Sequence, residues 1–328
     1  MHDVTAAAAY VPADDLAIIA SYFNPSRYRV KLRNLEAFSE PFSRGGVPLF
    51  IVEHTVEGTA FELSDRPGVT RIRGGDTLWQ KERLLNIVID ALPDRFTKIA
   101  WVDADVLFSD PEWIVRVSAL LDRYAVVQPF AEAVRLPPST HAFEGVGQRH
   151  RSFAGVYERD PHLVLHDNYD RHGHSGFAWA ARRDALPRGL YDACIAGSGD
   201  HMMAHAFVGD WDSACIGRTF GRGAMRKHFV AWAEETYAAV RANVGCVAGS
   251  VLHLWHGDIV NRRYVSRHTD LIKRRFDPFR DIVLDASGCW NWASHRPDLA
   301  QWAAEYFAGR REDSFGTPAQ VATGGPGF

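Results

Sequence analysis

The sequence predicts an α/β protein built on a mostly parallel central sheet flanked by helices, with a C-terminal helical extension. Two observations support this fold class. Short apolar segments of strand length alternate with helical segments over the first 130 residues, an order typical of parallel sheets. The 328 residues are also enough for a large core. We expect an arm at 1–14, a main domain at 15–275, the extension at 276–312 and a disordered tail at 313–328.

The first half of the chain supplies most of the expected sheet. Each expected strand is a short apolar or alternating run bounded by turn residues; these runs are 16–22, 48–53, 69–73, 99–102 and 124–129. Helices are expected between them, at 26–42, from 77 or 78 onward, and at 111–123. No G-x-G-x-x-G follows the first strand and no G-x-x-x-x-G-K-[ST] occurs, which disfavours dinucleotide-binding and P-loop folds.

The second half is less regular. Residues 136–174 are polar and rich in Gly and His, and we expect a long loop with little regular structure. A strand is expected at 176–182. Gly197-Ser198-Gly199 then predicts a turn into a helix, and a strand is expected at 251–258, where His256 and Gly257 lie near its end.

Composition limits the function classes. The net charge of −3 gives no argument for nucleic acid as a partner, and no apolar run has transmembrane length. The four cysteines show no C-x-x-C spacing, so neither a zinc knuckle nor a disulfide framework is indicated. Scattered thiols and the absence of a signal-peptide pattern predict a cytoplasmic protein. The basic run 273–275 is the one feature that would suit a peripheral site on the inner face of a membrane.

The strongest functional signal is Asp103-Ala104-Asp105, which follows the buried strand 99–102. In extended geometry, residues two apart point the same way, so both carboxylates can face one site. Two close carboxylates repel each other unless a cation lies between them. A divalent metal with phosphate ligands is the cation that fits. D-x-D is a weak pattern alone, and 210–212 also matches it without a preceding strand.

Later polar residues could complete such a site. Asp200 follows the Gly-rich turn, where its side chain could cap the helix or act as a catalytic carboxylate, and the sequence favours neither. His253 and His256 are three apart, so in a strand they would face opposite sides. Arg262 and Arg263 could bind phosphate or form a solvated basic face.

These motifs, taken in order, resemble a family. They are a strand-turn-helix start, an acid-ended strand, the segment 79–86, the D-x-D strand, Gly-Phe-Ala-Trp at 176–179, the Gly-rich turn with Asp200, and a late His before Gly. Over about residues 15–270 the chain resembles the GT-A glycosyltransferases. It is most similar to the branch of the β-1,4-galactosyltransferases and the polypeptide N-acetylgalactosaminyltransferase catalytic domains.

The resemblance implies roles for individual residues. It makes Asp105 and His256 ligands of Mn²⁺ (or Mg²⁺), with Asp103 near the ribose or the metal, and Asp200 the acceptor-activating base. The residues implied in donor binding are Asn24, Ser26, Arg27, Glu53, Lys81, Asn86, Asp103 and Trp179. Arg262 and Arg263 are added to this set as candidate phosphate partners. Residues 15–130 would then bind the donor and 131–275 the acceptor. The turn at 197–200 lacks the tryptophan of the family's Gly-Trp-Gly-Gly-Glu-Asp segment.

The expected function is therefore a metal-dependent glycosyltransferase that moves a sugar from a UDP-sugar to an acceptor hydroxyl with inversion. The acceptor is open among glycan, lipid-linked and other hydroxyl compounds. Two alternatives remain: a sugar-phosphate nucleotidyltransferase, and a non-catalytic sugar- or nucleotide-binding protein of the same fold.

Overall fold

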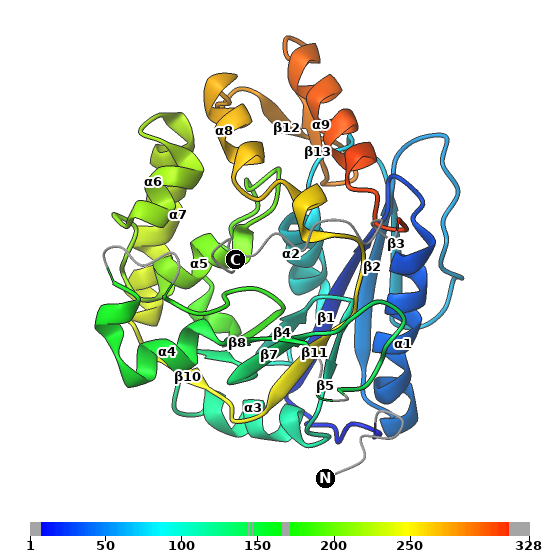
Figure 1. Ribbon diagram of the computed structural model, residues 1–328, viewed down its shortest axis with the longest axis vertical. Coiled ribbons are helices and arrows are strands. Elements are labelled where there is room, and N and C mark those ends of the chain that lie inside the picture. The colour runs from blue at the N-terminus through cyan, green and yellow to red at the C-terminus, as the bar shows by residue number, and fades with distance from the viewer. Residues whose placement is uncertain (1–7, 144, 146, 166–170, 315–328) are drawn as a thin grey trace.

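A mixed seven-stranded sheet forms the centre of the protein (Figure 1). The computed structural model describes residues 8–143, 145, 147–165 and 171–314. The strand order is β10-β6-β9-β4-β1-β2-β3, and the bounds are β1 (Leu16–Phe23), β2 (Leu49–Thr55), β3 (Val69–Arg73), β4 (Lys98–Val102), β6 (Val126–Gln128), β9 (Ala178–Arg182) and β10 (Val244–Cys246). Only β9 runs antiparallel to its neighbours, which confirms the predicted mostly parallel sheet.

Helices cover both faces of this sheet, and the alternation of side chains along β1 decides which core each residue joins. Leu16 and Ile18 pack into the core beneath α1 (Arg29–Gly45) and α3 (Trp113–Leu121). Ala17 and Ile19 point the other way, into the larger core. The helices around that second core include α2 (Lys81–Ala91), α5 (Gly199–Phe207), α6 (Ala214–Phe220), α7 (Ala224–Val240) and α9 (Pro297–Gly309). The predicted fold class therefore holds for both layers of helices.

A smaller four-stranded sheet lies beside the carboxyl end of β4, in the order β5-β11-β7-β8. Its strands are β5 (Val106–Phe108), β7 (Glu132–Arg135), β8 (Gln148–Arg151) and β11 (Ser250–His253). The D-x-D residues 103–105 occupy the short turn between β4 and β5. This turn therefore connects the two sheets, and its side chains lie where the sheets meet.

The expectation of a long irregular loop at 136–174 is wrong. Within its described residues the structure has β8, the helix α4 (Phe153–Arg159) and a 3-10 turn η1 (Pro161–Leu163), while 144, 146 and 166–170 lie outside the described residues. Ser152 caps α4 by accepting a hydrogen bond from the Gly155 N–H (3.1 Å), and Phe153 is fully buried. The buried Phe153 side chain and the Ser152 cap thus help to order a stretch of mostly polar composition.

The C-terminal part contains a β-hairpin besides its helix. Strands β12 (Ile282–Leu284) and β13 (Trp290–Trp292) pair antiparallel before α9. The Gln80 side chain donates to the Trp290 carbonyl (2.7 Å) and accepts from the Trp290 N–H (3.1 Å), so the hairpin binds the residues just before α2. The remaining elements are η2 (Arg183–Ala185), η3 (Ile259–Arg262) and α8 (Ser266–Lys273). Among the described residues, no helix is long and apolar enough to span a membrane.

Asp313, the last acidic residue described, caps the first helix. Its two carboxylate oxygens accept hydrogen bonds from the N–H groups of Arg29 (2.9 Å) and Val30 (2.8 Å) at the start of α1. Residue Tyr28 at the helix boundary provides no side-chain cap of its own. The expected tail at 313–328 therefore begins with a residue that is bound, and 315–328 lie outside the described residues.

We expect Asp313→Ala to lower the free energy of unfolding by about 1 kcal/mol, because two N–H groups at the start of α1 lose their acceptor. Urea denaturation checks this value. Asp14→Ala, which removes an exposed carboxylate from the turn before β1, is the control and should change the free energy by less than about 0.5 kcal/mol. Equal effects of the two substitutions would contradict the capping role.

Candidate functional site

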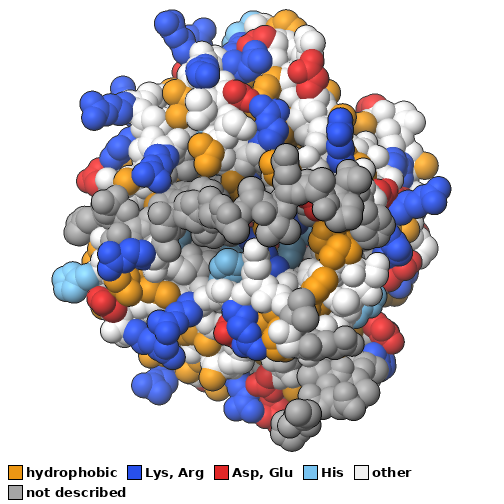
Figure 2. Space-filling view, in the orientation of Figure 1, with side chains coloured by type: hydrophobic (Ala, Val, Ile, Leu, Met, Phe, Trp, Pro, Cys, Tyr) orange, Lys and Arg blue, Asp and Glu red, His pale blue; other side chains and the backbone are white. Residues whose placement is uncertain are grey.

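A cavity of about 250 Å³ opens at the carboxyl ends of β1 and β4, between the two sheets. Histidine side chains are visible in a hollow near the centre of the corresponding face (Figure 2). Ligands of parallel α/β sheets bind at this edge. Six of the residues predicted from the sequence line the cavity together: Lys81, Asp103, Asp105, Asp200, His256 and Arg262.

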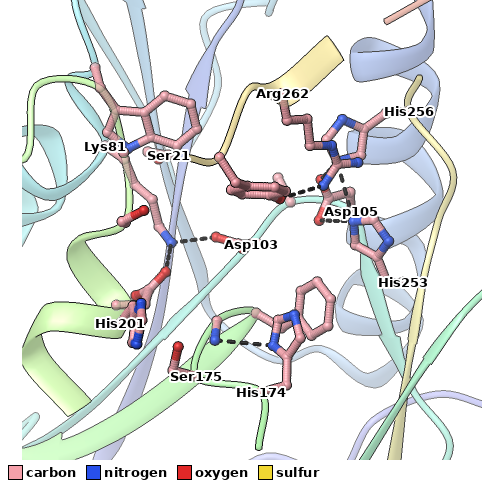
Figure 3. Close-up of a pocket in the computed structure, with 18 of the residues that line it drawn as sticks. Ser21, Lys81, Asp103, Asp105, His174, Ser175, His201, His253, His256 and Arg262 are labelled. Carbon is pink, nitrogen blue, oxygen red and sulfur yellow. Dashed lines mark hydrogen bonds and ion pairs between the residues drawn. The ribbon is translucent and has the colours of Figure 1, made fainter. Parts of the chain in front are cut away.

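The two acids of the D-x-D segment face the same cavity but have different partners (Figure 3). Asp103 Oδ1 lies 2.5 Å from Lys81 Nζ, whereas Asp105 Oδ2 lies 2.9 Å from His256 Nε2. Strand β4 ends at Val102, so the alternation of an extended strand does not apply to residues 103–105. The two side chains therefore have different partners, but both carboxylates face one cavity, as expected from the sequence.

Asp105, His253 and His256 form a group of three metal-binding side chains. One ligand atom from each lies within 4.8 Å of the others. The Nε2 atoms of the two histidines are 3.2 Å apart, and His253 Nε2 lies 4.0 Å from Asp105 Oδ1. The expectation that the histidines face opposite sides fails because β11 ends at His253, so the chain turns before His256. Asp103 does not belong to this group.

The protonation of these side chains fits a bound cation. Arg262 Nη2, which can only donate, lies 3.0 Å from His256 Nε2, and Asp105 Oδ2 lies 2.9 Å from the same nitrogen. The Asp105 carboxylate beside it can only accept, and its Oδ1 is buried without a hydrogen-bond partner among the described residues. Burial lowers the pKa of His253 well below its ordinary value, which keeps that imidazole neutral. A carboxylate and two imidazoles thus converge, a mixed donor set that a divalent metal would stabilise.

Asp105 itself is held as a carboxylate. Burial alone would raise the pKa of its carboxyl, but His256, His253 and Arg262 hold that pKa below its ordinary value. An ionised carboxylate with two imidazoles leaves several coordination positions of an octahedral ion open. The set could therefore hold a metal that also binds oxygen atoms of a ligand.

On the other side of the cavity, Lys81 lies between Asp103 and Asp200. Its Nζ is 2.6 Å from Asp200 Oδ2, and the indole N–H of Trp101 donates to Asp200 Oδ1 (3.3 Å). Burial alone would lower the pKa of Lys81, but Asp103 and Asp200 raise it well above its ordinary value. Burial raises the pKa of Asp103 to about 6 against the attraction of Lys81.

These contacts decide between the two roles left open for Asp200. The residue at the start of α5 is Ser198, and both oxygens of the Asp200 carboxylate are bound by Lys81 and Trp101 rather than by the helix N-terminus. Asp200 therefore does not cap the helix. Gly199 is required beside it, because a Cβ at this position would overlap the Glu82 carboxyl.

The cavity carries more cationic than acidic side chains. Four acids line it, namely Glu82, Asp103, Asp105 and Asp200, against six cations, namely Lys31, Lys81, Arg135, Arg262, Arg267 and Arg310. Burial raises the pKa of Glu82 to about 8, so this carboxyl is mostly neutral at pH 7. An anionic ligand such as a diphosphate would balance the remaining positive charge.

The residues predicted at the first turn and at the end of β2 gather around Glu62 instead of lining the cavity. Asn24 Nδ2 donates to Glu62 Oε2 (3.0 Å), and Arg27 lies 3.5 Å from the same carboxylate. Glu53 accepts from the N–H groups of Glu62 (2.5 Å) and Leu63 (3.1 Å). Ser26 lies in the same turn. These contacts fix the loop between β2 and β3, and nucleoside binding by these residues stays a prediction.

Three further predicted residues also lie outside the cavity lining. Trp179 is fully buried in the core and donates to the Ser175 carbonyl (2.7 Å). The Asn86 amide pairs with both backbone groups of Leu190 (2.8 and 2.9 Å). Arg263 is exposed and pairs with Asp270 (2.6 Å). Each has a structural partner that accounts for its position, so Arg262 alone of the two arginines faces the cavity.

The structure adds residues that the sequence did not single out. Arg310 lines the cavity, and Glu312 Oε2 lies 3.3 Å from His256 Nδ1, on the ring edge opposite Asp105. Lys31, from α1, reaches the cavity while donating to the Phe23 carbonyl (2.7 Å). Arg310 and Glu312 lie far from the other site residues in sequence and belong to no motif, so no spacing could have indicated them.

Glu82 provides a pH-dependent test of the described geometry. Its carboxyl titrates near 4.5 when unperturbed and near 8 when folded. Between these values the folded state binds more protons than the unfolded state, so stability falls as the pH rises. Gln cannot lose a proton. As the pH rises across this window, the free energy of unfolding of the wild type should fall relative to that of Glu82→Gln by up to about 1.4 kcal/mol per pH unit. Denaturation at several pH values checks this, and a pH-independent difference would contradict it.

No protein-family model and no curated protein matches the sequence. Among solved structures, it is similar to glucosyl-3-phosphoglycerate synthase from Mycobacterium tuberculosis in complex with Mn²⁺, UDP and phosphoglyceric acid (12% identity, 83% of this chain, 82% of that chain, TM-score 0.37). It is also similar to Drosophila β1,4-galactosyltransferase 7 in complex with xylobiose (12%, 88%, 98%, 0.33). These values are too low to assign the chain to a family.

Proposed function

We propose that the protein is a metal-dependent glycosyltransferase that transfers a sugar from a UDP-sugar to an acceptor hydroxyl with inversion. One observation carries the proposal: a carboxylate and two imidazoles converge on one side of a cationic cavity, and a separate carboxylate, Asp200, faces the same cavity from another side. A metal held by the carboxylate and the two imidazoles would stabilise the charge of a leaving diphosphate. Asp200 would accept the proton of a hydroxyl nucleophile.

On the metal side, Asp105, His253 and His256 would hold the ion. Mn²⁺ suits a mixed set of carboxylate and imidazole better than Mg²⁺, which favours oxygen ligands. When bound, the metal would supply charge stabilisation to the diphosphate. Arg262 lies beside the ligand set and can donate hydrogen bonds to phosphate oxygens. A similar triad serves iron oxygenases, but the six lining cations favour a phosphorylated ligand here.

On the base side, Asp200 would accept the proton of the acceptor hydroxyl. The acceptor oxygen forms a bond to the anomeric carbon while the bond from that carbon to the diphosphate oxygen breaks, and the electron pair leaves with UDP. Attack from the side opposite the diphosphate inverts the configuration. Lys81 orients the Asp200 carboxylate and remains paired with Asp103 after the proton transfer. Lys81 thus acts as a positioning residue.

The two alternatives predict other chemistry. A nucleotidyltransferase would release pyrophosphate from a nucleoside triphosphate and a sugar phosphate. A non-catalytic binding protein would bind a nucleotide-sugar and leave it intact. The paired Asp200 carboxylate, which has no role as a helix cap, favours the transferase over the binding protein.

The experiment is a panel of UDP-sugars, including UDP-galactose and UDP-N-acetylgalactosamine, incubated with the protein and Mn²⁺. Released UDP and pyrophosphate are both measured, with and without EDTA. Release of UDP that depends on Mn²⁺ supports the proposal. Pyrophosphate released in a parallel incubation with a nucleoside triphosphate and a sugar phosphate would support the nucleotidyltransferase instead. Mn²⁺-dependent UDP binding without turnover would support the binding protein.

A further inference from the structure

A second cluster of metal-binding side chains lies at the wall of the proposed catalytic cavity, and two of its members, His172 and His201, line that cavity. The cluster consists of His172, His201, His205 and Cys215, whose ligand atoms all lie within 4.8 Å of one another. His201 and His205 are on α5, His172 is in the segment before β9, and Cys215 is on α6. His201 and His205 are four residues apart, so they lie on one face of the helix, the spacing found in helical zinc sites.

The three imidazole rings have the spacing expected around one tetrahedral ion. Their centroids are 4.8 Å (His172–His201), 5.2 Å (His172–His205) and 5.1 Å (His201–His205) apart. Three imidazoles bound to a tetrahedral zinc at about 2.1 Å would place their ring centres about 5 Å apart. The rings are therefore already arranged around a common point.

Hydrogen bonds at Nδ1 orient two of the three rings. His205 Nδ1 lies 2.9 Å from the buried Asp210 carboxylate, and His172 Nδ1 lies 2.7 Å from the Gly173 carbonyl. Both partners can only accept, so each Nδ1 carries the proton and each Nε2 a lone pair. Metal-bound histidines have such carboxylate or carbonyl partners as a rule.

The hydrogen bonds of the cluster do not account for His205 Nε2. His172 Nε2 and His201 Nε2 are 3.0 Å apart and could share one proton. His205 is completely buried, and its Nε2 has no hydrogen-bond partner in the part of the chain that the structure describes.

We propose that His172, His201, His205 and Cys215 bind a structural Zn²⁺ ion. Three imidazoles and a thiolate complete a tetrahedral shell, which leaves no open position for a substrate and so gives the ion a structural role. Binding releases the Cys215 thiol proton to solvent. The net charge of the site therefore rises by one, because the ion brings two positive charges and one proton leaves. In the sequence, this site is indicated by His201-x-x-x-His205 and not by a C-x-x-C pattern.

The ion would fix the first turn of α5. That turn carries Asp200 directly before His201, and the zinc ligands come from three separate segments of the chain. The site stands apart from the Asp105 group and does not depend on the proposed function, because a structural zinc is compatible with any activity of the cavity.

The test is metal analysis of the full-length protein expressed with zinc and dialysed against EDTA at a concentration that removes Mn²⁺. About one zinc per chain is expected to remain. Replacement of the zinc by Co²⁺ should give thiolate-to-cobalt charge-transfer absorption and the intense visible bands of a tetrahedral site. A wild-type protein that retains no zinc and binds none on addition overturns the proposal, whatever the variants do.

The variants locate the site. Cys215→Ser and His205→Ala are expected to lose the zinc and the cobalt charge-transfer band, and Asp210→Asn to weaken zinc binding by about 10- to 100-fold. Cys246→Ser, a cysteine outside the cluster, is the matched control and keeps the zinc. Asp105→Asn also keeps it, so this result is independent of whether the transferase proposal holds. Zinc retained in full by folded Cys215→Ser and His205→Ala proteins would refute the assignment.

Discussion

Asp200→Asn should lower the turnover of sugar transfer by about 10³-fold, within the usual contribution of a general base. The amide keeps the size of the side chain but cannot take a proton from the acceptor hydroxyl. UDP-sugar binding should change little, because the metal-binding group and Arg262 are unaltered. Steady-state kinetics for turnover and calorimetry for UDP binding separate the two effects.

Asp192→Asn is the matched control for this substitution. Asp192 also pairs with a basic residue, Arg83 at 3.2 Å, but it does not line the cavity. Its amide should leave transfer within a few-fold of wild type. Turnover that survives Asp200→Asn would remove Asp200 from the mechanism.

Asp105→Asn should weaken Mn²⁺-dependent UDP binding by about 100-fold or more, since even the outer partners of metal ligands contribute 10- to 100-fold. The substitution removes the charged ligand and leaves two imidazoles beside Arg262, whose positive charge repels a cation. Asp103→Asn should cost less metal affinity, because Asp103 pairs with Lys81. Titration with Mn²⁺ at a fixed UDP concentration measures the metal affinity of both variants.

The chain contains its own control for this prediction. Asp212 is the second acid of the other D-x-D match, where it is exposed and paired with Arg226. Asp212→Asn should leave Mn²⁺ and UDP binding unchanged. If the two asparagine variants bind Mn²⁺ equally well, the metal is not held by Asp105.

The fold could be predicted because local patterns determine it. Alternating apolar runs identified β1, β2, β3 and β4 to within one or two residues. The stretch 136–174 could not be predicted in the same way, because α4 is ordered by Phe153 packing into a core made of distant residues. The hairpin at Trp290 has the same cause, since its partner Gln80 is remote in sequence.

The predicted residues that line the cavity lie at or near an end of a strand or helix. Asp103, Asp105, Asp200 and His256 satisfy this condition, and the structure brings them to one cavity. The orientation of their side chains was not predictable, because each follows the last residue of a strand or a turn with an irregular backbone. The sequence also could not separate a residue near the site, such as Glu53, from one that lines it, since that depends on which loop the side chain binds.

The contacts of residues 310–313 have a consequence for biosynthesis. N-terminal segments of a chain are made first and begin to fold first, yet here Glu312 reaches His256 and Asp313 caps α1. A nascent chain that still lacks these residues has the D-x-D turn and both histidines but not the carboxylate beside His256. The proposed metal site would therefore be completed only after Glu312 is made, and a partly made chain would not yet hold the ion in its final geometry.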